Sequence, residues 1–116
     1  LLRGIGCNWL VCLAVFAAAA STETIGKIAA LWFPTMAFVA LGMEHCIANM
    51  FFIPLGILTG TDPRYIALAE AGKAAALKAD FYSFVAGNLV PVTIGNIIGG
   101  SVLVGMLYLA ANIKKA

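Results

Sequence analysis

The sequence predicts an all-α integral membrane protein. Hydrophobic residues make up 63% of its 116 positions and charged residues only 10%, a composition outside the range of ordinary soluble domains. Long apolar stretches alternate with short polar connections, as in proteins that cross a membrane several times. The net charge of +2 comes from a few residues in loops and at the C-terminal end, so no nucleic-acid partner is expected. The lipid bilayer is therefore the first predicted partner.

The first predicted span is residues 1–20, from about Leu2 to Ala20, which is long enough to cross the hydrocarbon layer. It ends where Ser21 begins a short polar connection. Leu1 opens directly into this apolar stretch, with no initiating methionine and no basic leader. We therefore expect the chain to be the C-terminal portion of a longer protein.

The second predicted span, residues 28–58, is too long for one straight crossing. As a helix, about thirty residues would reach roughly 45 Å, against a hydrocarbon layer of about 30 Å. Gly42, with Pro34 before it and Pro54 after it, supplies residues that interrupt helices. We expect two half-helices that meet near the bilayer midplane, where such breaks form solute sites. The expected halves are residues 28–41 and 46–58.

A helix at the membrane surface is predicted after the broken span. Asp62 is suited to the N-cap of a helix and Pro63 to its first position. Residues 62–79 are alanine-rich with charges on one side, which favours an interfacial helix. The aromatic segment 80–88 then predicts a short helix that leads into the final span.

The final predicted span, residues 91–112, contains a close-packing motif and a polar side chain. Gly95 and Gly99 form a GxxxG step, which lets a neighbouring helix backbone approach closely. Asn96 in this span and Asn8 in the first are single amides among apolar residues, and buried amides need hydrogen-bond partners. Two roles are open for them. One is structural, bonding to each other or to a neighbouring helix, and the other is functional, contact with a permeating anion or fixing of the helix break.

Glu44 and His45 lie side by side in the middle of the broken span, where we expect the chemistry of this chain. A titratable group at bilayer depth is costly and usually faces a cavity or a partner, so His45 is predicted to be functional. Glu44 has two open roles, anchoring of the backbone N–H groups freed at the break and proton transfer. Asn49, four residues after His45, is predicted to orient the break. Phe38, seven residues before His45, either faces the same passage or packs against lipid.

No metal or cofactor is expected, because the three cysteines show no metal-site spacing and His45 is the single histidine. One alternative is a membrane redox or metal-binding subunit that uses Glu44, His45 and Cys46 as ligands, although adjacent residues rarely converge on one ion. Another alternative is a structural fragment that conducts nothing.

Three separated motifs carry a resemblance to a known family. They are CNWLVCLAV from Cys7 to Val15, LWFPTMAFVALGMEHCIANMFFIPLG from Leu31 to Gly56, and NLVPVTIGNIIGG from Asn88 to Gly100. Together they resemble the formate/nitrite transporter family. The resemblance implies an aquaporin-like protomer of six transmembrane helices in two inverted repeats, assembled as a homopentamer. This chain would then form the second repeat, with three transmembrane helices, one of them broken.

The resemblance also implies roles for individual residues. His45 would be the central pore histidine and Phe38 an apolar constriction. Asn8 and Val11 would contribute to the narrow region near it, and Asn96 would line the pore or stabilise the last helix. The residues expected to shape the break and its hydrogen bonds are Gly42, Glu44 and Asn49.

The function implied by the resemblance is passage of small monovalent anions across an inner or plasma membrane by a multi-pass channel or transporter, not an enzyme. Formate is the favoured substrate, because FFIPLG and NLVPVTIGN resemble the formate-type branch. Nitrite and hydrosulfide remain alternatives. Protons are a further expected partner, since a protonatable His45 can donate a hydrogen bond or a proton to the anion and so make permeation pH-dependent.

Overall fold

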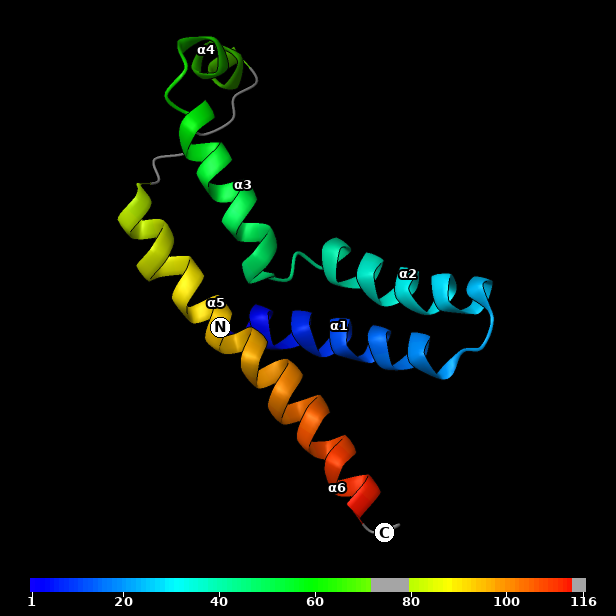
Figure 1. The fold of residues 1–116 in the computed structure, drawn as a ribbon. Helices are drawn as coiled ribbons and strands as arrows, with labels where there is room; N and C mark the ends of the chain where they lie inside the picture. The colour runs from blue at the N-terminus through cyan, green and yellow to red at the C-terminus, as the bar shows by residue number, and fades with distance from the viewer. Residues whose placement is uncertain (72–79, 114–116) are drawn as a thin grey trace. The chain divides into compact units, whose positions relative to one another are not determined.

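The computed structural model describes residues 1–71 and 80–113, and every regular element in these ranges is a helix (Figure 1). The chain divides into two compact units. The first unit contains Leu1–His45 together with Pro91–Ala116, and the second contains Cys46–Val90.

In the first unit, α1 (Leu2–Ala20) and α2 (Thr24–Ala40) run antiparallel and pack side by side, joined by a short connection (Figure 1). Because α2 begins at Thr24, it includes part of the connection that the sequence predicts before Ile28. The other face of α1 packs against η2 (Ile98–Met106).

Gly95 and Gly99 let α1 approach the C-terminal helix closely. A Cβ atom added at Gly95 would lie 2.5 Å from the carbonyl oxygen of Leu1, and one at Gly99 would collide with the carbonyl of Ile5. Real Cβ atoms do not come so near a backbone oxygen, so side chains at these two positions would separate the helices. The predicted role of the GxxxG step is confirmed.

The break after α2 lies at Gly42, and the expectation that Pro34 and Pro54 help to interrupt the helices is wrong. Pro34 lies inside α2 and Pro54 inside α3 (Cys46–Thr59), and both helices continue past them. Gly42 instead has a φ of +60°, the left-handed conformation that glycine adopts just beyond helix ends. The C-terminal hydrogen bonds of α2 follow the Schellman pattern: the amide of Gly42 donates to the carbonyl of Val39, and the amide of Met43 to that of Phe38, each at 3.0 Å.

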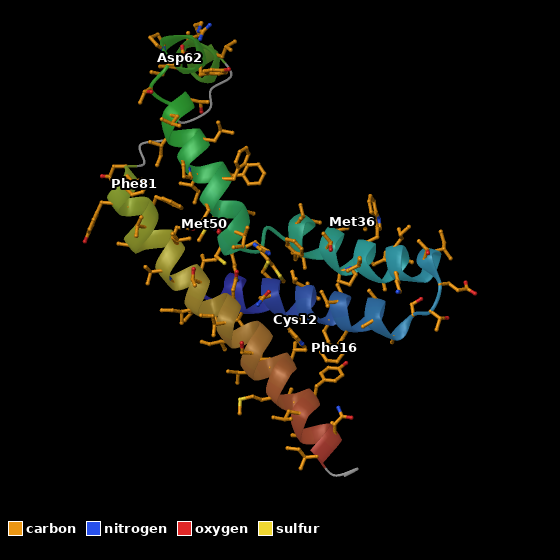
Figure 2. All side chains as sticks on the ribbon, viewed as in Figure 1. Cys12, Phe16, Met36, Met50, Asp62 and Phe81 are labelled. Carbon is orange, nitrogen blue, oxygen red and sulfur yellow. The ribbon has the colours of Figure 1, made fainter. Side chains whose placement is uncertain are left out.

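The second unit holds α3, α4 (Pro63–Ala71) and η1 (Ser83–Leu89), with α3 packed against η1. Asp62, labelled in Figure 2, caps α4 as its position predicts, because its Oδ1 accepts a hydrogen bond of 2.9 Å from the amide of Arg64. The guanidinium of Arg64, 2.7 Å from the carboxylate, and this amide hold the pKa of Asp62 below its ordinary value. Residues 72–79 of the predicted interfacial helix lie outside the described residues.

The C-terminal residues form one continuous helical stretch, Ser83–Ile113, where the sequence predicts a short helix followed by a separate span. Its backbone alternates between π-helical η1, α5 (Val90–Ile97), π-helical η2 and α6 (Leu107–Ile113). Pro91 has no N–H to donate, and it falls where the bonding pattern changes from π to α, so the helix continues through it. This stretch and α1 are long and apolar enough to cross a membrane.

Candidate pore site at the helix break

The turn at Gly42 brings His45 back to Phe38. The centroids of the two rings lie 5.9 Å apart, with their planes inclined by 34°, which is within the usual range for aromatic contacts. The Schellman turn ends α2 at Gly42, and the residues that follow place the ring of His45 next to that of Phe38. Both side chains are half-buried. The structure therefore places together the two residues predicted to form the centre and a constriction of a pore.

Asn96 holds the main chain immediately before His45. Its side chain is buried, with 5% of its surface exposed, and its Nδ2 donates to the carbonyl oxygen of Glu44 at 3.0 Å and to that of Gly4 at 2.9 Å. The carbonyl of Glu44 belongs to the peptide group that leads into His45. A single amide on α5 thus ties the break to the start of α1.

A second main-chain contact supports the same connection. The amide of Glu44 donates to the carbonyl of Arg3 at 3.4 Å, a longer and weaker hydrogen bond. The backbone of Glu44 therefore contacts both α1 and α5, and the two roles of its side chain, anchoring and proton transfer, stay predictions.

Asn8 bridges α1 and α5 in the same unit. Its Nδ2 donates to the backbone carbonyl oxygen of Asn96 at 2.7 Å. Of the two roles left open for the amides by the sequence, bonding between helices is observed for both Asn8 and Asn96. Contact with an anion remains a prediction. Val11, three residues further along α1, is half-buried.

In the second unit, Asn49 donates from its Nδ2 to Oδ1 of Asn88 at 2.7 Å. Asn49 lies in the first turn of α3 and Asn88 in η1, so this bond joins the two helices that pack there. Asn88 begins the third family motif, but the sequence alone did not predict it as the partner of Asn49. A single amide in an apolar helix is the signal that singled out Asn8 and Asn96, and it applies equally to Asn88.

Within residues 1–68 and 80–113, no three His, Cys, Asp or Glu side chains gather in a way that could hold a metal ion. The described residues thus supply no ligand set for the alternative of a metal-binding subunit built on Glu44, His45 and Cys46.

Comparison with known proteins places the chain in a family. The formate/nitrite transporter family matches residues 1–110. The chain belongs to the formate/nitrite transporter family. It is 47% identical over 113 residues to a probable formate transporter of Methanothermobacter thermautotrophicus, covering 97% of this chain and 35% of that protein. It is 39% identical over 115 residues to the formate channel BtFdhC of Bacillus thuringiensis, covering 99% of this chain and 38% of that channel.

A solved structure shares the fold. A pentameric formate channel with formate bound superposes with a TM-score of 0.81 at 38% sequence identity, covering 97% of this chain and 45% of that one. The chain thus spans between a third and a half of the length of these relatives, which are transporters and channels rather than enzymes. The resemblance found in the three sequence motifs is confirmed at the level of the family.

Proposed function

We propose that the complete protein conducts small monovalent anions, formate above all, through a pore to which His45 and Phe38 contribute. Nitrite and hydrosulfide are the alternative substrates within the same family. In this proposal the chain supplies the second inverted repeat, with three transmembrane helices, of a six-helix protomer in a multi-pass pentamer of the inner or plasma membrane. The similarity to a pentameric formate channel with formate bound supports both the substrate and the assembly.

The observation that carries the proposal is the ring contact of Phe38 with His45 at an anchored helix break. The break itself is anchored by Gly42 in its left-handed conformation and by the hydrogen bond from Asn96 to the carbonyl of Glu44. The rings lie 5.9 Å apart, so a titratable group and an apolar ring are held next to each other. An apolar ring excludes water, and an imidazole beside it can stabilise an anion that has lost its hydration by donating a hydrogen bond to it.

The chemistry follows from the cost of removing an anion from water, which is large unless hydrogen bonds or an opposite charge replace the hydration. A protonated His45 can donate an N–H hydrogen bond to a carboxylate oxygen of formate. It can also transfer that proton, which leaves neutral imidazole and neutral formic acid, and the neutral acid passes an apolar ring more easily than the anion. The imidazole then regains a proton from the solution on the side where the anion entered, and the formic acid releases one to the solution on the other side.

The test is uptake of labelled formate by proteoliposomes that contain the complete protein, measured from about pH 5 to pH 8, the range in which imidazoles change charge. Protein-free liposomes correct for formic acid that diffuses through lipid. We expect protein-dependent uptake to fall as pH rises, because the imidazole loses its proton, and a His45→Ala variant to respond much less to pH.

A His45→Gln variant separates the two roles of the imidazole, since glutamine donates a hydrogen bond but does not titrate. It should retain more uptake than His45→Ala while lacking the pH response. If the unchanged protein and the His45→Ala variant show the same uptake at every pH, His45 has no part in permeation.

A further inference from the structure

Gly100 faces α1 next to Gly99, but a side chain there would meet different atoms. A Cβ atom at Gly99 would collide with backbone of α1, at the carbonyl of Ile5. A Cβ atom at Gly100 would instead collide with Nδ2 of Asn8, and it would lie 3.3 Å from Cγ of Asn8 and 3.0 Å from Sγ of Cys12. The amide of Asn8 therefore occupies the space that any side chain at position 100 would take.

The amide of Asn8 lies in that space because of its hydrogen bond. Its Nδ2 donates at 2.7 Å to the backbone carbonyl of Asn96, four residues before Gly100. The backbone bonding changes from α-helical to π-helical between Ile97 and Ile98, just after this carbonyl. Side chains commonly bond to backbone where the helical ladder changes in this way. The hydrogen bond to Asn96 and the absence of a side chain at Gly100 thus together fix the position of the Asn8 amide.

We propose that Gly100 is a positioning residue for Asn8. Because it has no side chain, the Asn8 amide can reach the carbonyl of Asn96 and is held at one place on the face of α1. The inference rests on the proposed function, in which Asn8 contributes to the narrow region of the pore. A methyl group at position 100 displaces a side-chain end rather than backbone, so it moves the amide and leaves the helices packed.

The test uses Gly100→Ala in the complete protein, reconstituted in proteoliposomes with labelled formate as the probe. We expect initial uptake to fall, because the displaced amide no longer lines the narrow region, with the pentamer retained on size-exclusion chromatography. Gly99→Ala should instead weaken the pentamer or the fold, because its methyl group meets backbone. Gly105→Ala is the matched control in the same helix, since its Cβ would meet only the carbonyl of Gly100, at an ordinary 3.6 Å.

Combined variants show which neighbour transmits the effect. In an Asn8→Ala background, Gly100→Ala should cause no further loss of uptake, because the amide it displaces is gone. In a Cys12→Ala background it should still lower uptake by the same factor, since the thiol is not the group that acts. Provided that the unchanged protein takes up formate, an equal loss in the presence and absence of the Asn8 amide would overturn the proposal, and so would unchanged uptake in Gly100→Ala alone.

The same variants give a measurement that does not depend on transport. Gly100→Ala should lower the thermal unfolding temperature of the purified protein when Asn8 is present, and should not lower it in the Asn8→Ala background. If the unchanged protein takes up no formate while this dependence holds, the proposed function fails and the positioning of Asn8 by Gly100 stands. If the effect of Gly100→Ala on the unfolding temperature does not depend on Asn8, the positioning role is refuted whatever the uptake of formate.

Discussion

Substitution of Asn96 by alanine tests whether one buried amide holds the helix break in place. The variant loses both hydrogen bonds donated by Nδ2, at 2.9 Å to the carbonyl of Gly4 and at 3.0 Å to that of Glu44. It keeps the backbone carbonyl that accepts from Asn8. Only 5% of the surface of Asn96 is exposed, so water has little access to replace the lost donors.

The expected size of the effect follows from the two bonds. Hydrogen bonds between membrane helices contribute about 0.6 kcal/mol on average and up to about 1.7 kcal/mol. A buried carbonyl left without a donor costs about 1–3 kcal/mol in soluble proteins. We therefore expect Asn96→Ala to lower the free energy of unfolding by about 1–3 kcal/mol. Titration of the complete protein with sodium dodecyl sulfate in mixed micelles measures this difference.

Asn112 supplies the matched control. Its Nδ2 also donates to a backbone carbonyl, that of Tyr108 at 2.8 Å, but the side chain is exposed and the bond lies within one helix. Asn112→Ala should change the free energy of unfolding by no more than about 0.5 kcal/mol. If Asn96→Ala is no more destabilising than Asn112→Ala, the amide does not anchor the break.

Three further predictions concern other contacts. Asn49→Ala and Asn88→Ala should each destabilise the fold, and the double variant should lose less than the sum of the two, because a hydrogen bond joins the pair. Strict additivity of the two losses in the same detergent titration would contradict this. Gly95→Ala should lower the yield of pentamer on size-exclusion chromatography, since its methyl group would meet backbone of α1, and a normal yield would argue against the packing. Arg64 lowers the pKa of Asp62, so the cap on α4 should be fully present above the ordinary pKa of an aspartate and lost as pH falls through the lowered value. Circular dichroism should show helix loss on acidification that is smaller in Asp62→Ala, and an identical acid response in the two proteins would count against the cap.

The location of the break illustrates how much could be predicted from the sequence. A stretch too long for one crossing, with Gly42 in its middle, predicts an interruption there, and the structure has α2 ending at Ala40 and α3 beginning at Cys46. The two prolines misled the prediction. A proline removes one backbone donor, and whether a helix then ends depends on its surroundings, which no local pattern describes.

The hydrogen-bond partners of polar residues were harder to predict than the position of the helix break. The sequence shows that the amides of Asn8 and Asn96 need partners, and it favours bonding between helices only somewhat over contact with an anion or fixing of the helix break. The partner proved to be backbone on a neighbouring helix in both cases. Asn88 was not predicted as the partner of Asn49, because 39 residues separate them in the sequence.

The sequence by itself determined the membrane class, the family, the interruption at Gly42 and the close packing of helices at Gly95. Each of these depends on composition, on a run of motif residues or on the spacing of residues within one helix, and helical spacing is the same in any context. Only the tertiary structure decided that Asn96 donates a hydrogen bond to the peptide carbonyl before His45 and that the amide of Asn8 fills the space beside Gly100. Contacts between helices depend on how two backbones dock, and that is set by the packing of many side chains together.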